Sequence, residues 1–160
     1  MNQQIGYQGQ VTTKPFFLDT NGSGSAGWEK DSAIFYVYAY NNAEPSTYKW
    51  ISEYGTRSGV TISGSGSYTL HVFRIDVNKY DRFNFVRFNP NGANIPSWNR
   101  EDSPKSLWDQ TSAQTYSSST NYYKVNSSTR IINGDGYGHD TASISTTSKV
   151  NESSGNLVWA

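Results

Sequence analysis

The side chains best suited to chemistry in this chain are aromatic rings. Tyr38 and Tyr40 fall on one side of a predicted strand at residues 34–40, and Trp50 follows where the chain can return beside them. Such rings have flat apolar faces, which can stack on the C–H face of a sugar, while nearby amides bind its hydroxyls. We therefore interpret these three residues as a candidate sugar-stacking set. The alternative, that they belong to the core, stays open.

A second aromatic cluster lies further along the chain. Trp98 follows Pro96 in a polar segment, where an exposed ring could be a second stacking plate or could cap the open end of a sandwich. Both interpretations are kept. The remaining members of this cluster are Trp108 and its polar neighbours Asn89, Asn99, Asp109 and Gln110.

Residues for catalysis are sparse. The only histidines are His71 and His139, there is no cysteine, and no serine has the sequence context of a nucleophile elbow. Glycoside hydrolysis would need two carboxylates facing each other across a cleft, about 5 to 10 Å apart. The candidate carboxylates are Glu29, Asp31, Glu44, Glu53, Glu101 and Asp102. Most of these lie in turn-like segments, so we expect that the protein is not an enzyme.

One segment resembles a loose calcium loop. Residues 133–140 (NGDGYGHD) place oxygen ligands at alternate positions but lack the spacing and terminal Glu of an EF-hand. A glycine-rich hairpin turn explains the same residues and is the interpretation that we favour. We expect no metal and no cofactor, and folding that does not depend on a metal.

The composition limits the classes of partner that this chain could bind. The 160 residues suit one domain, 1–160, and 15% are aromatic although only 34% are hydrophobic. Lys+Arg and Asp+Glu number 13 each, and this zero net charge argues against nucleic acid and against an anionic membrane. A neutral, hydroxyl-rich partner fits better. We expect an extracellular or cell-surface location; because residues 1–10 contain no signal-peptide hydrophobic region, a leader would be missing from this sequence.

The chain is predicted to be all-β. Segments rich in β-branched and aromatic residues, at 34–40, 68–77 and 83–88, alternate with clusters of Gly, Asn, Ser and Pro. This pattern indicates a single-domain antiparallel β-sandwich. A short helical turn is conceivable at residues 104–108, and the tail, 126–160, could be extra strands or part linker.

Alternation within the strands predicts which side chains face the core. In the first segment Phe35, Val37 and Ala39 form the expected core row, and the tyrosines between them face the other way. In the second, residues 71, 73, 75 and 77 form the core row, with His71 at its rim. The third segment is expected to be partly buried on both faces.

The order of these motifs resembles starch-binding carbohydrate-binding modules of family 26. The similarity rests on FFLD at residues 16–19, Trp28, YAYN at 38–41 and Trp50, followed by FVRFNP at 85–90 and WDQT at 108–111. It covers roughly residues 16–125.

That resemblance implies a β-sandwich that binds α-1,4-glucans, with Tyr38, Tyr40 and Trp50 stacking on glucose rings. It also implies a larger amylolytic protein as the context. We add Trp98, Trp108 and Gln110 as further candidate ligand-binding residues. The main alternative is a structural or adhesive module whose aromatic residues form a protein interface.

Overall fold

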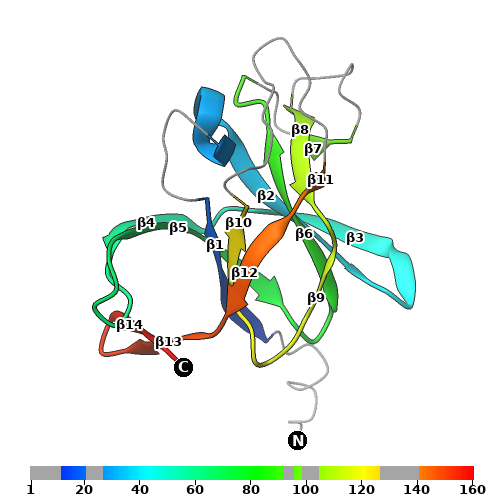
Figure 1. Cartoon of the computed structure of the whole chain (residues 1–160). Helices are drawn as coiled ribbons and strands as arrows, with labels where there is room; N and C mark the ends of the chain where they lie inside the picture. Colours follow the sequence, from blue (N-terminus) through cyan, green and yellow to red (C-terminus); the bar gives the residue numbers. More distant parts are fainter. Residues whose placement is uncertain (1–11, 21–26, 92–95, 99–104, 127–140) are drawn as a thin grey trace, which may run out of the picture.

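The computed structural model describes residues 12–20, 27–91, 96–98, 105–126 and 141–160. They form two packed β-sheets and a separate hairpin (Figure 1). The prediction of an all-β sandwich is confirmed.

The first sheet has the strand order β12-β10-β1-β5-β4. Its central strand β1 pairs antiparallel with β5 and parallel with β10. The strands are β1 (Thr13–Asp19), β4 (Gly55–Val60), β5 (Tyr68–Asp76), β10 (Tyr122–Val125) and β12 (Ile144–Ser148).

The second sheet has the order β11-β8-β6-β2-β3, and it positions the aromatic residues singled out above. Two short strands, β7 and β9, pair with β8 and β6. The bounds are β2 (Ile34–Asn41), β3 (Glu44–Ser52), β6 (Arg82–Phe88), β7 (Pro96–Ser97), β8 (Lys105–Thr111), β9 (Gln114–Thr115) and β11 (Thr141–Ala142).

Two local expectations need correction. The sheets are mixed rather than purely antiparallel, because β1 with β10, β8 with β11, and β7 with β8 are parallel pairs. The helical turn that was conceivable at residues 104–108 does not form from Lys105 onward, where β8 runs instead. Pairing with β6 supplies the backbone hydrogen bonds that a single helical turn could not.

The main core lies between the two sheets. Phe35, Val37 and Ala39 are 3%, 0% and 0% exposed, which confirms the predicted core row of β2. They pack with apolar side chains of β1, β5 and β6, including Phe16, Phe73, Phe83 and Phe85. Alternation in β2 therefore sends its tyrosines to the outer face of the second sheet.

The described part of the tail, residues 141–160, is built from strands. β11 joins the second sheet and β12 joins the first, while β13 (Val150–Ser153) and β14 (Asn156–Trp159) form the hairpin at the lower left of Figure 1. The hairpin buries Val150 and Leu157 against Phe17, Leu70 and other residues of the first sheet. It thus covers part of that sheet's outer face.

One 3-10 element precedes β2. It spans η1 (Gly27–Ser32) and buries Trp28, whose ring stacks on Phe35 at 6.0 Å between centroids. The buried guanidinium of Arg87 holds this element by donating from Nε to the carbonyl of Trp28 (2.9 Å) and from a terminal nitrogen to that of Lys30 (2.7 Å). Among the described residues, no helix is long and apolar enough to span a bilayer.

Candidate functional site: an aromatic hollow on the second sheet

Three rings from separate elements meet on the outer face of the second sheet. Tyr38 of β2 is the direct register partner of Trp50 in β3, and Trp98 follows β7. The ring centroids of Tyr38 and Trp50 are 4.8 Å apart, those of Tyr38 and Trp98 4.9 Å, and those of Trp50 and Trp98 4.7 Å. The structure therefore brings the two predicted aromatic clusters together through Trp98.

The rings are tilted rather than coplanar. The planes of Tyr38 and Trp50 make an angle of 55°, and those of Tyr38 and Trp98 an angle of 75°. Tyr40 stands next to Tyr38 on the same face, with centroids 5.7 Å apart. The site consequently has walls at different angles rather than one flat platform.

These rings rest on a small apolar layer of their own. Val86, Phe88 and Leu107 are fully or almost fully buried on this outer side, beneath rings that include Tyr38 and Trp50. The Trp50 ring meets Phe88 edge-on at 5.3 Å. This support limits ring movement, so a ligand would meet surfaces that are already in place.

The hollow beside these rings has a volume of about 430 Å³. Its described lining contains no charged side chain. It consists of Tyr38, Tyr40, Asn42, Pro45, Asn84, Trp98, Gln110 and Ala113. Rings and polar uncharged groups together suit a neutral ligand with both apolar faces and hydroxyls.

The amides in the hollow divide into two kinds. Asn84 donates its side-chain N–H to the carbonyl of Thr111 at 2.8 Å, which ties β6 to β8. The side-chain amides of Asn42 and Gln110 have no hydrogen-bond partner within the described residues. Those two amides are therefore available to donate to, and accept from, ligand hydroxyls.

Tyr38 keeps its proton at neutral pH. Burial raises the pKa of its phenol, and the neighbouring phenols of Tyr48 and Tyr40 raise it further, against an opposing hydrogen bond with the Trp98 side chain. A neutral phenol can donate one hydrogen bond and accept others. This again suits a hydroxyl-bearing ligand.

Of the ligand-binding residues predicted from the sequence, all but Trp108 lie at the hollow. Tyr38, Tyr40, Trp98 and Gln110 line the hollow, and Trp50 supports it from the side. Trp108 lies elsewhere: only 5% of it is exposed, and its ring lies 5.4 Å from the guanidinium carbon of Arg87.

Sequence reasoning missed Tyr48. This residue is 53% exposed and its ring stacks on Tyr38 at 5.3 Å and 28°. Tyr48 and Trp50 are two positions apart in one strand and so share a face. The spacing of two residues between Tyr48 and Trp50 was the sequence feature that could have identified Tyr48.

The catalytic candidates that the structure describes do not flank this hollow. Glu29 and Glu53 both contact the imidazole of His71, with their carboxylate oxygens 2.5 Å from Nε2 and 3.0 Å from Nδ1. Asp31 and Glu44 are exposed. Asn99, Glu101, Asp102, His139 and the segment 133–140 lie outside the described residues. In the part of the chain that is described, no three acidic or histidine side chains form a metal-binding group.

The His71 cluster is a structural ion pair near the core. Burial alone would lower the histidine's pKa, but its hydrogen bonds to Glu29 and Glu53 outweigh burial and raise the pKa to about 9. For Glu29, burial acts to raise the pKa, yet the hydrogen bonds from His71 and Thr20 prevail and lower it. The imidazole is therefore positively charged at neutral pH and both its nitrogens donate.

Comparison with known proteins gives no family assignment. No protein-family model, no curated protein and no solved structure matches this chain significantly. The functional argument therefore depends on the geometry of the hollow.

Proposed function

We propose that this chain is a non-catalytic module that binds an α-glucan, such as amylose or a maltooligosaccharide, in the hollow beside Tyr38 and Trp98. The observation that carries the proposal is the uncharged lining of this hollow, in which three aromatic rings accompany the amides of Asn42 and Gln110, which have no partner within the described residues. Glucose units offer the complementary surface of C–H faces and hydroxyl edges.

The tilt of the rings favours an α-glucan over a flat polymer. In an α-1,4-linked chain, each sugar is rotated relative to its neighbour, so successive faces do not lie in one plane. Lining rings whose planes are inclined by 46° and 75° can meet such successive faces, whereas a ribbon-like β-1,4 chain would suit a coplanar row. The motif resemblance to family 26 points to the same ligand.

Affinity at one such site would be modest, because a few ring contacts contribute on the order of 1 kcal/mol each beyond area burial. Attachment to an amylolytic protein at the cell surface or outside the cell would raise effective affinity through avidity. We include that context in the proposal.

The test is affinity electrophoresis of the full chain in gels that contain amylose, cellulose or xylan. We expect retardation by amylose only, with loss of retardation in Trp98→Ala and partial loss in Gln110→Ala. Tyr54→Ala is the matched control, since Tyr54 is an exposed ring, 68% accessible, that lines a different hollow. Thermal melting of each variant establishes that it is folded.

Two outcomes would contradict the proposal. One is unchanged amylose retardation in Trp98→Ala. The other is an absence of retardation by all three polysaccharides in the wild-type chain. Self-association in solution that Trp98→Ala abolishes would instead support the alternative of a protein interface.

A further inference from the structure

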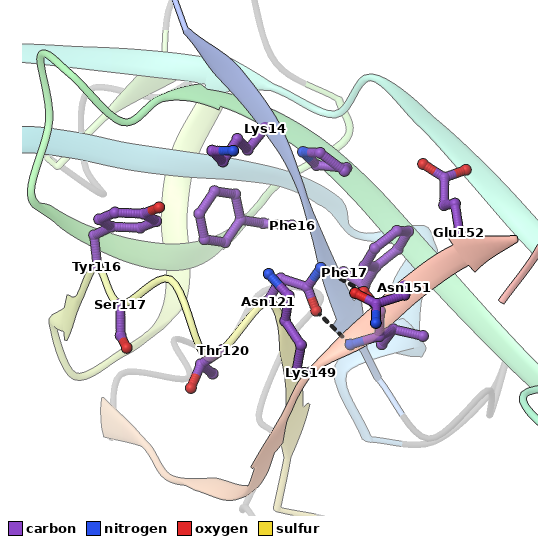
Figure 2. Close-up of a pocket in the computed structure, with 12 residues that line it drawn as sticks. Lys14, Phe16, Phe17, Tyr116, Ser117, Thr120, Asn121, Lys149, Asn151 and Glu152 are labelled. Atoms are coloured by element: carbon purple, nitrogen blue, oxygen red, sulfur yellow. Dashed lines mark hydrogen bonds between the residues drawn. The ribbon is translucent and has the colours of Figure 1, made fainter. Parts of the chain in front are cut away.

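Two further hollows lie next to each other, beside β1 and the β13–β14 hairpin. The larger has a volume of about 230 Å³ and the smaller about 190 Å³. Both are lined by Pro15 and Phe17 of β1 and by Glu152 of β13. Figure 2 shows the smaller hollow, with Tyr116 at one edge and Glu152 at the opposite edge.

Charge distinguishes this pair of hollows from the aromatic hollow on the second sheet. Lys14 and Lys149 line the smaller hollow, and Arg57 and Arg74 line the larger one. Glu152 is the one acidic residue in the described lining of both. Four cationic side chains and one carboxylate thus line the two hollows, in a chain whose net charge is zero. Such local concentration of one sign attracts a ligand of opposite charge.

The four cationic side chains differ in how many ion pairs and hydrogen bonds they form within the protein. Arg57 is held in the fold, because it pairs with Glu152 at 3.3 Å and donates to the carbonyl of Gly155 at 3.1 Å. Lys149 donates to the carbonyl of Ser118 at 3.0 Å, and its other two N–H groups have no partner among the residues that the structure describes. Lys14 and Arg74 form no ion pair within the described residues. These two are the cations most available to a ligand.

Arg74 also holds an exposed ring in position. Its guanidinium carbon lies 4.6 Å from the centroid of the Tyr54 ring, and this phenol is 68% exposed. A cation over one face of a ring leaves the opposite face open. Tyr54 is therefore a stacking surface beside a guanidinium that can bind a carboxylate through two parallel hydrogen bonds.

The smaller hollow supplies the hydrogen-bonding groups that a sugar needs. The Thr120 hydroxyl and the Asn151 amide line this hollow (Figure 2) and have no side-chain partner within the described residues. Asn121, at the centre of the view, is occupied by two hydrogen bonds to the backbone of Val150. It forms part of the floor.

We propose that these adjacent hollows are a second binding site, which takes an acidic polysaccharide whose sugars carry carboxylates. The carboxylates pair with Arg74 and Lys14, the sugar faces stack on Tyr54, and the hydroxyls bind Thr120 and Asn151. Nucleic acid is disfavoured because the chain as a whole carries no net charge. This site is independent of the proposed glucan site and uses none of its residues.

Titration with polygalacturonate by isothermal calorimetry, at low and at physiological ionic strength, tests the site. We expect binding that weakens with salt, and a loss of about fivefold in affinity for each of Arg74→Ala and Lys14→Ala, the upper end of what one solvent-exposed ion pair contributes. Lys30→Ala is the matched control: it removes the same charge from η1, where Lys30 lies 3.8 Å from Asp31. It should leave the affinity unchanged.

Conservative variants separate the roles of the ring and the charge. Arg74→Lys retains the cation but loses the planar fork, so its affinity should fall between those of the wild type and Arg74→Ala. Tyr54→Phe retains the ring and should bind like the wild type, whereas Tyr54→Ala should bind weakly. Thermal melting establishes that each variant is folded.

Three results would overturn the proposal: the absence of polygalacturonate binding by the wild type, an equal loss in Lys30→Ala and Arg74→Ala, or tighter binding of a single-stranded oligonucleotide than of polygalacturonate. Trp98→Ala distinguishes this site from the glucan site. It should abolish amylose binding while leaving polygalacturonate affinity unchanged, so either site can fail without the other.

Discussion

Tyr38 and Trp50 are direct partners across the β2–β3 pair, with ring centroids 4.8 Å apart. This pairing places Trp50 between the exposed Trp98 and the buried Phe88, with centroid distances of 4.7 Å and 5.3 Å. Trp50 thus has two roles: it supports the exposed rings, and it covers the small apolar layer on the outer face of the second sheet.

Replacing Trp50 by alanine should weaken glucan binding and also destabilise the protein. The ring covers Phe88, so its removal exposes apolar surface and leaves a void. We expect a loss of about 2 kcal/mol in the free energy of unfolding, below the range for a fully buried Trp because Trp50 is only partly buried. Urea denaturation measures this loss, and Trp50→Phe should recover most of it. Unchanged stability in Trp50→Ala would contradict the supporting role.

In β2, the side of the strand on which each aromatic residue lies could be predicted from the sequence. Phe35, Val37 and Ala39 alternate with Tyr36, Tyr38 and Tyr40, and a period of two fixes which set is buried once one set is apolar. The position of Trp98 beside Tyr38 could not be predicted, because it depends on how the chain returns after β6, which local pattern does not encode. The parallel pairing of β1 with β10 is a long-range contact of the same kind.

Trp108 shows where alternation fails as a guide. The register of β6 with β8 shifts between Arg87 and Phe88, so counting residues from Gln110 does not give the side on which Trp108 lies. The buried Arg87 was likewise visible as a charged residue in line with Phe83 and Phe85. Its partners, the carbonyls of Trp28 and Lys30, became clear only from the fold.

Stability should depend on pH through His71. The folded-state pKa is about 9, above the unfolded value of 6.5, so the charged imidazole stabilises the fold fully below pH 6.5. This contribution, on the order of 3 kcal/mol, should be lost as the pH rises from about 6.5 to about 9. The free energy of unfolding from urea titrations at several pH values measures it.

The matched variant for this pH dependence is His71→Gln, which cannot become charged. Its stability should vary much less between pH 6.5 and pH 9. Glu29 affects stability at acidic pH. Its pKa in the folded state is lowered from 4.5, so its contribution to the free energy of unfolding is fully present above pH 4.5 and is lost as the pH falls through the folded-state pKa. A wild-type stability that is constant from pH 6.5 to pH 9 would contradict the proposed charge state of His71.

Arg87 should be among the most sensitive positions in the fold. It is 0% exposed, and burial lowers its pKa to about 10 although the charges of Asp109, Asp31 and Glu29 favour the protonated form. Arg87→Met would leave two carbonyl groups of η1 without their donor and remove the cation facing buried Asp109. We expect a loss of about 3 kcal/mol or more.

Urea denaturation of Arg87→Met and Arg87→Lys measures that loss. Lysine keeps the charge but cannot span the carbonyls of Trp28 and Lys30 with a planar fork, so we expect it to recover only part of the stability. If Arg87→Met were as stable as the wild type, the guanidinium would not be what holds η1 in place.

Asn121 should determine how firmly the β13–β14 hairpin is attached. Its side chain donates to the carbonyl of Val150 at 2.9 Å and accepts from the amide of the same residue at 2.8 Å, as a strand partner would. Asn121→Leu removes both hydrogen bonds and leaves two buried backbone groups unpaired, which we expect to cost about 2 to 3 kcal/mol. Asn121→Asp keeps the acceptor but places a carboxylate against the Val150 carbonyl, so it should also destabilise the attachment of the hairpin.

Hydrogen exchange followed by mass spectrometry localises the effect of these variants: protection should fall in β13 and β14 and persist in β2 and β6. Uniform loss of protection across both sheets would instead mean that Asn121 stabilises the whole sandwich rather than the hairpin.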